Sequence, residues 1–106
     1  MTSPKWQHSP GDTYSVVVCQ FVGDEETGYR SSYSLLAGPF ESRATAWRHG
    51  VSDMGHDDFN LAAVRDGQLV AMIWNDEIVD DGADVLAVVS EQTGLPGPAP
   101  EGGDAR

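Results

Sequence analysis

The stretch FNLAAVRDGQLVAMIW, residues 59–74, predicts a β-hairpin and decides the fold. Asp66-Gly67 separates two apolar runs, and it favours a type I′ turn because both central residues of that turn need a positive φ. This turn sets a register that places Leu61 opposite Met72, and opposite residues share a face. We expect the first face to lie under the helices. The second face is also apolar, and we expect it either to be covered by a tail or by loop 23–28, or to form an interface with a partner. The first face carries Phe59, Leu61, Ala63, Val70, Met72 and Trp74, and the second carries Asn60, Ala62, Val64, Leu69, Ala71 and Ile73.

Two strands are predicted upstream of this hairpin. Residues 14–22 are β-branched and aromatic with few polar side chains on either face, which predicts a central strand covered on both sides. Residues 23–28 form a turn with an acidic tip, and residues 29–37 return as an antiparallel strand. We expect Gly38-Pro39 to end that strand, because proline cannot donate to a sheet ladder.

A first helix is predicted after Ser42, which suits the N-cap position. Its apolar residues recur at helical spacing: Ala44, Trp47, Val51 and Met54. Gly50 interrupts this pattern, so the helix ends either near His49 or near Met54, and the sequence leaves both open.

A second helix is predicted over residues 81–93, with Asp80 or Asp81 as its cap and Gly94 just beyond its end. Its buried stripe consists of Val85, Leu86, Val88 and Val89. The element order is therefore β-β-α-β-β-α. This order indicates an α+β fold, with a four-stranded antiparallel sheet and two helices packed on one face.

The ends of the chain are predicted to be disordered tails, over residues 1–12 and 96–106. They carry proline, glycine and polar residues that bury too little surface to offset the entropy of ordering. A single domain over residues 13–95 lies between them. Trp6 is the exception in the first tail, and we expect it to pack onto the domain.

Composition excludes several classes of function. The 106 residues include 17 Asp and Glu against 6 Lys and Arg, a net charge of −11. Phosphates would repel such a surface, so we expect no direct binding to nucleic acid and no membrane binding. The single cysteine excludes an internal disulfide and a Cys-based zinc site. The first residues lack a secretory signal pattern, and we expect a cytoplasmic protein.

An acidic cluster is the main candidate site, formed by Asp76, Glu77, Asp80, Asp81 and Asp84. It is either a solvated helix start that the helix dipole stabilises or a patch that docks a basic partner. Docking of this kind would be fast and sensitive to salt. The spacing does not match the ligand positions of an EF-hand calcium loop.

Metal and catalytic sites are weakly indicated. Nitrogen and oxygen ligands could come from His49, Asp53, His56, Asp57 and Asp58, although these also suit a polar loop beside a helix end. No Lys, Arg or His adjoins Cys19 to activate its thiol, and we expect a small buried side chain. No nucleophile elbow, P-loop or dinucleotide fingerprint is present. We therefore expect no cofactor, no metal and no enzymatic activity.

Residues 33–46, YSLLAGPFESRATA, resemble the strand–Gly-Pro-Phe–helix unit of SPOR-type peptidoglycan-binding domains. The resemblance implies a glycan-binding module. It covers 14 of the 106 residues, and no second β-α-β half accompanies it.

Charge and missing catalytic groups together predict a small binding or regulatory protein that acts through protein–protein contact. Its expected partner has a basic surface, for example a nucleic-acid-binding protein, and a homodimer through the second hairpin face is a further expectation. There are two alternatives. One is a SPOR-like peptidoglycan-binding module, and the other is a small enzyme or metal-binding protein.

Overall fold

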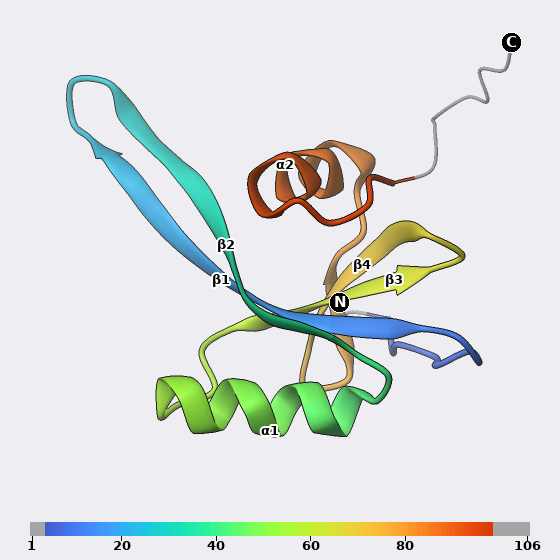
Figure 1. The fold of residues 1–106 in the computed structure, drawn as a ribbon. Helices are drawn as coiled ribbons and strands as arrows, with labels where there is room; N and C mark the ends of the chain where they lie inside the picture. The colour runs from blue at the N-terminus through green and yellow to red at the C-terminus, as the bar shows by residue number, and fades with distance from the viewer. Residues whose placement is uncertain (1–3, 99–106) are drawn as a thin grey trace, which may run out of the picture.

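The computed structural model describes residues 4–98, which form an α+β fold (Figure 1). Its elements are β1 (Thr13–Asp24), β2 (Gly28–Phe40), α1 (Arg43–Met54), β3 (Asn60–Arg65), β4 (Gln68–Trp74), β5 (Glu77–Asp80) and α2 (Ala83–Thr93). The strands form one antiparallel sheet in the order β2-β1-β3-β4-β5. The α+β class is confirmed, but the prediction of four strands is wrong, because β5 adds a fifth strand. A two-residue turn at Asn75 and Asp76, both with positive φ (52° and 71°), returns the chain beside β4.

The two helices lie on opposite faces of the sheet, and the prediction that both pack on one face is wrong (Figure 1). The physical reason is that both faces of the 59–74 hairpin are apolar, and each must be removed from water. Under α1 the buried cluster contains Tyr14, Val16, Ala46, Phe59, Leu61, Ala63, Ala71 and Ile73. Under α2 it contains Val17, Ala62, Leu69, Met72, Leu86 and Val89. Of the second predicted hairpin face, Ala62 and Leu69 lie under α2, whereas Ala71 and Ile73 lie under α1, so the two helices cover this face in place of the tail, loop or second copy that we expected.

The 59–74 hairpin has the expected turn but a shifted register. Asp66 and Gly67 have φ values of 56° and 75°, as a type I′ turn requires. Val70 has no partner across the ladder, which marks a β-bulge. Beyond this bulge Leu61 lies opposite Ile73 and not opposite Met72. The bulge therefore decides which apolar residues of β4 lie under α1 and which lie under α2.

Strand β2 continues through Gly38-Pro39 to Phe40, so the prediction that it ends at Gly38 is wrong. The strand is at the edge of the sheet and its register is irregular at this point, and both conditions tolerate the missing N–H of proline. Gly38 has φ 128° and lies against Ser15, where a Cβ would clash.

Helix α1 takes the longer of the two alternatives and ends at Met54. Gly55 caps it in the left-handed region with φ 77°, and Ser42 is the expected N-cap, since its Oγ accepts from the Thr45 N–H at 3.3 Å. Gly50 is buried inside the helix. A Cβ at this position would lie closer than 3.0 Å to three ring carbons of Phe59, so this glycine serves close packing and not helix termination.

The prediction that Asp80 or Asp81 caps helix α2 is wrong, because the helix begins at Ala83 and its N-cap is Gly82. Gly82 occupies the N-cap position without a side-chain bond, and Asp80 Oδ1 instead accepts from the Gly82 N–H at 2.9 Å. Gly94 ends the helix with φ 82°, as expected. Val88, predicted in the buried stripe, is 38% exposed.

The segment before β1 lies against the domain over residues 4–12. Lys5 forms an antiparallel bridge with Glu77 of β5. Trp6 packs on the buried cluster under α1, and we expected this side chain to pack onto the domain. Near the other end, the Leu69 N–H donates to the Gly97 carbonyl at 3.1 Å. The rest of the predicted C-terminal tail, residues 99–106, lies outside the described residues.

The outer halves of β1 and β2 project from the body as a two-stranded arm (Figure 1), which we define as residues 19–33. Strand β1 is buried from Tyr14 to Val17, and from Cys19 onward it is exposed except for half-buried Val22. The prediction of a strand covered on both sides therefore holds only for its first half, and the prediction of a buried Cys19 is wrong. Among residues 4–98, no helix combines the length and apolar character needed to cross a membrane.

Candidate protein-binding surface

The arm carries large apolar side chains into solvent. Phe21 is 78% exposed and Tyr29 is 64% exposed. A two-stranded hairpin without a packed face is marginally stable in water, so an arm of this kind gains from contact with another surface. At its tip, the Asp24 carboxylate accepts from the backbone N–H groups of Glu26 (3.0 Å) and Thr27 (2.8 Å). The bonds from Thr27 are the main cause that lowers the pKa of Asp24, which keeps the tip negatively charged.

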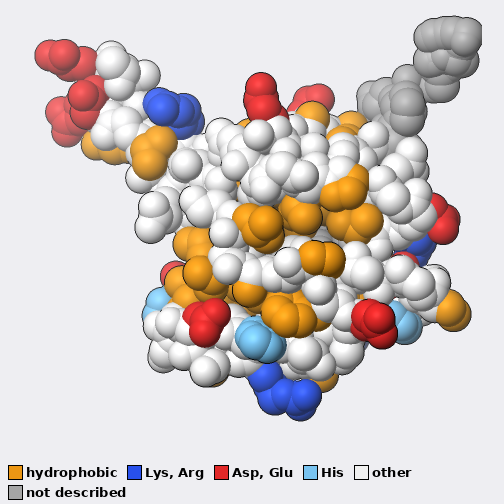
Figure 2. Space-filling model, in the orientation of Figure 1, with side chains coloured by type: hydrophobic (Ala, Val, Ile, Leu, Met, Phe, Trp, Pro, Cys, Tyr) orange, Lys and Arg blue, Asp and Glu red, His pale blue; other side chains and the backbone are white. Residues whose placement is uncertain are grey.

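Of the seven large hydrophobic residues that are exposed among residues 4–98, six lie on the same side of the sheet as α2. Phe21 follows buried Val17 at even spacing along β1, and Leu35 lies directly opposite Val17. By the same rule, Trp74 shares the face of buried Met72. We call these six residues the α2-side surface: Phe21, Tyr29, Leu35, Trp74, Val79 and Val88. Figure 2 shows hydrophobic side chains gathered between the two helices, and the arm at upper left ending in acidic side chains.

Two hollows indent this surface. The larger, the arm groove, has a volume of about 410 Å³ between the arm and α2, and it is lined by Arg30, Ser31, Tyr33, Asp84, Val85, Val88 and Gln92. The smaller, about 190 Å³, is lined by Cys19, Asp58, Phe59, Asn60, Trp74 and Val79. Cys19 and Tyr33 are cross-strand neighbours, so they connect the two hollows. The arrangement suits a chain segment that places successive side chains into adjacent hollows.

Three of the five predicted acidic residues lie near this surface. Asp84 lines the arm groove, and Asp81 is exposed just before α2. Asp80 lies close to Tyr33: burial is the main cause that raises the pKa of Tyr33, and the charge of Asp80 acts in the same direction. The start of α2 therefore gives one end of the apolar surface a negative border.

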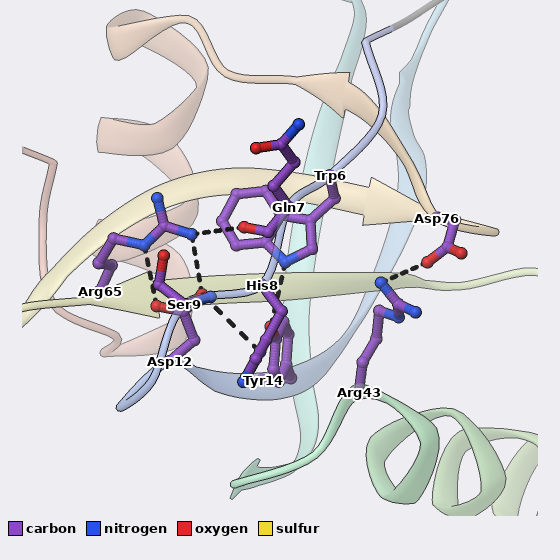
Figure 3. Close-up of polar contacts among 9 residues, drawn as sticks. All are labelled: Trp6, Gln7, His8, Ser9, Asp12, Tyr14, Arg43, Arg65 and Asp76. Atoms are coloured by element: carbon purple, nitrogen blue, oxygen red, sulfur yellow. Dashed lines mark hydrogen bonds and ion pairs between the residues drawn. The ribbon is translucent and has the colours of Figure 1, made fainter.

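The other two predicted acidic residues lie elsewhere. Asp76 forms an ion pair with Arg43 at the start of α1 (Figure 3), beside a hollow of about 230 Å³ that Trp47 also lines. Glu77 is half-buried within β5. Because β5 is extended, its first and last residues lie about 10 Å apart, so acidic residues that are close in sequence separate into two groups.

A polar cluster that the sequence analysis missed holds residues 4–12 in place (Figure 3). Arg65 donates to both carboxylate oxygens of Asp12, from Nε at 2.9 Å and from Nη2 at 2.8 Å. The Arg65 guanidinium also lies 4.7 Å from the Trp6 ring centroid. The Trp6 indole N–H donates to the Tyr14 hydroxyl at 3.0 Å, and His8 Nδ1 lies 2.6 Å from that hydroxyl. Asp12 and Arg65 are 53 positions apart, and no local pattern connects them.

The electrostatics of this cluster favour a structural role. The Arg65 hydrogen bonds are the main cause that lowers the pKa of Asp12, and burial is the main cause that raises the pKa of Tyr14. Asp12 therefore stays ionised and Tyr14 stays protonated at neutral pH. Both side chains bond to other residues of the chain, and these bonds hold residues 4–12 against the domain.

The predicted metal ligands are not brought together. His49 stacks on Phe40 with ring centroids 4.5 Å apart, and His56 Nδ1 accepts from the Asp58 N–H at 3.0 Å. Within residues 4–98, no group of three or more His, Cys, Asp or Glu side chains could hold a metal ion.

Comparison of this chain with family models, with curated proteins and with solved structures finds no match. The likeness to SPOR-type domains thus remains a prediction from residues 33–46 alone.

Proposed function

We propose that this chain is a protein-binding module that takes an extended, basic segment of a partner protein along the α2-side surface. The observation that carries this proposal is that six of the seven exposed large hydrophobic residues in the described part of the chain gather on one side of the sheet. Scattered apolar residues are normal on a protein surface, whereas a gathered set is typical of an association site.

Charge selects the class of partner. The surface lies between the acidic arm tip (Asp24, Glu25 and Glu26) and the acidic start of α2 (Asp80, Asp81 and Asp84). With a net charge of −11, the chain attracts a basic partner at long range, and the apolar hollows then hold its side chains. Binding therefore depends on both salt and apolar contact.

Binding is favoured over catalysis by what lines the two hollows. Their linings include the Cys19 thiol and the Tyr33 hydroxyl but no histidine or lysine among the described residues. The acidic side chains there are Asp58 and Asp84, and neither hollow supplies the histidine that most often activates a catalytic thiol or hydroxyl.

The test is an NMR titration with a synthetic peptide that alternates lysine with leucine. We expect shift changes in the arm and α2, and an affinity that falls as salt rises from about 50 to 300 mM. The double variant D81N/D84N should bind roughly three- to tenfold more weakly, because each exposed ion pair contributes a fraction of a kcal/mol. The matched control is D53N/D66N, which removes the same charge from exposed residues at the end of α1 and in the turn between β3 and β4.

Two results would contradict the proposal. One is a set of shift changes confined to α1 or spread evenly over the chain. The other is equal binding of a peptide in which glutamate replaces each lysine. F21S tests the apolar contribution separately: Phe21 is 78% exposed, so the variant should keep its melting temperature and lose affinity.

A further inference from the structure

The two hollows of the α2-side surface carry the same three types of side chain. Each is lined by one aromatic ring, one carboxylate and one amide. In the arm groove these are Tyr33, Asp84 and Gln92, and in the smaller hollow they are Trp74, Asp58 and Asn60. An aromatic face attracts a cation, a carboxylate pairs with it, and an amide oxygen accepts from its N–H groups. The repeated set is therefore suited to a cationic side chain.

The two carboxylates are open to a partner. Within residues 4–98, neither Asp58 nor Asp84 takes part in an ion pair, and both residues are exposed. Arg30 also lines the arm groove, but it lies three positions from Tyr33 in β2, so strand alternation directs its side chain to the other face of the arm. The charge of Asp84 is thus available to a cation from outside the chain.

Hydrogen bonds place one group of each hollow before any ligand arrives. The Tyr33 N–H donates to Gln92 Oε1 at 2.7 Å, which fixes the Gln92 side chain beside the arm. The Trp74 indole N–H donates to the Asp57 carbonyl at 3.0 Å, which fixes the orientation of the ring in the smaller hollow. Groups that are already ordered lose less entropy on binding, so each hollow favours a side chain that matches its geometry.

We propose that the two hollows are arginine pockets, and that the partner segment carries two arginines four residues apart. A guanidinium group is planar and weakly hydrated, so it stacks on an aromatic ring while its edge donates to a carboxylate and to an amide oxygen. A lysine ammonium is a compact charge that does not make this combination. In the arm groove, the aliphatic part of the arginine lies on Val85 and Val88.

The order of the strands gives the spacing of the two arginines. Tyr33 is on β2 and Trp74 ends β4, with β1 and β3 between them, so the two rings are three strand spacings apart, or about 14 Å. An extended segment advances about 3.3 Å per residue, so residues four apart span about 13 Å. Side chains alternate along such a segment. An odd separation would therefore direct one arginine away from its pocket.

This inference rests on the proposed function and specifies which residues of the basic segment are recognised. The test is isothermal titration calorimetry of the full chain with short synthetic peptides of otherwise identical sequence. The reference peptide carries two arginines four residues apart. Two others replace both arginines with lysine, or with citrulline, which keeps the shape of arginine without its charge. A further peptide has its arginines three residues apart.

We expect the arginine peptide with the four-residue spacing to bind most tightly. Lysine should weaken binding at least threefold, because only the charge is kept, and citrulline at least tenfold, because both ion pairs are lost. The three-residue spacing should also weaken binding at least threefold, because one pocket stays empty.

Variants of the chain test each pocket. D58N and D84N should each weaken binding of the arginine peptide about three- to tenfold and leave binding of the citrulline peptide unchanged. D53N and D66N are the matched controls, since each removes one charge from an exposed residue outside the α2-side surface. Y33F keeps the ring and should bind like the unchanged chain, whereas Y33L should bind the arginine peptide several-fold more weakly. Melting temperatures of the variants distinguish a loss of binding from a loss of folding.

Three outcomes overturn the inference. They are equal affinity for the arginine and lysine peptides, equal affinity for the two arginine spacings, and a loss in D53N and D66N as large as in D58N and D84N. Equal binding of arginine and lysine, both tighter than citrulline, would overturn the arginine pockets and leave the proposed function standing. If no peptide binds, the inference and the proposed function both fail.

Discussion

Replacing Gly50 with alanine sets two opposing effects against each other in α1. Gly50 is buried in the middle of the helix, and its Cα faces the ring of Phe59. A Cβ at this position would lie closer than 3.0 Å to three of the ring carbons. The ring is 3% exposed and packs against Trp47 with centroids 5.1 Å apart, so it has little room to move away.

The structure determines which effect is larger. Alanine in place of glycine in a helix stabilises by about 1 kcal/mol through backbone entropy. Overpacking a closed core costs about 1–3 kcal/mol, and the upper part of this range applies here because the contact is with ring atoms of a buried side chain that also packs against Trp47. We expect G50A to lower the free energy of unfolding by roughly 1–2 kcal/mol. In a domain of this size the melting temperature then falls by about 5–15 °C.

Urea and thermal unfolding, followed by circular dichroism, measure this change. A double-mutant cycle with F59L identifies its cause, since leucine leaves space for the new methyl group. In the F59L background G50A should cost at least about 1 kcal/mol less than in the unchanged chain. The reasoning is refuted if G50A raises the melting temperature, or if its cost is the same in both backgrounds.

Three further predictions concern the N-terminal segment and the hairpin turn. R65A should lower the free energy of unfolding by roughly 2 kcal/mol, because it leaves the buried Asp12 carboxylate without its main partner. The folded-state pKa of Asp12 is lowered, so this pair stabilises the fold above the unfolded pKa of about 3.9 and the contribution is lost as pH falls through the folded pKa. Urea titrations from neutral to acidic pH should thus show a shallower acid loss in R65A than in the unchanged chain. W6A should speed proteolysis before β1 and lower stability by about 2 kcal/mol, since the indole packs on the core and donates to Tyr14; equal protease sensitivity would contradict this. G67A should cost about 1 kcal/mol by thermal unfolding, because φ 75° is unfavourable for alanine, and an unchanged melting temperature would count against the assigned turn.

Features that depend on a few neighbouring residues could be predicted from the sequence. The Asp66-Gly67 turn, the Ser42 cap and the helix end at Gly94 each follow from local backbone chemistry, and the structure has all three. The α+β class follows from the order of such elements. The acidic arm tip likewise needs only the turn signal of residues 23–28.

The candidate site could be predicted only in part. The sequence indicates the acidic residues at the start of α2 as a candidate site, but it does not indicate the α2-side surface beside them. Phe21 belongs to a strand whose apolar pattern is typical of a core, and nothing local indicates that the outer half of the β1–β2 pair projects into solvent. Asp76 and Asp84 are close in sequence, but they lie apart in the structure because β5 between them is extended. The sequence pattern does not indicate this separation.

The sequence alone determined the turns and the caps, because these depend on residues within a few positions of each other, and its composition determined the strong negative charge. Long-range packing decided the rest. Two apolar faces can be covered from one side or from both, and only the bulge at Val70 and the placement of α2 show that both faces are covered. The sequence alone is compatible with a helix that ends at Gly50, and only the structure shows that Phe59 packs against this glycine. Likewise, the pairing of Arg65 with Asp12 is evident only in the folded chain. Each of these outcomes depends on contacts between residues far apart in the chain, which a local pattern does not encode.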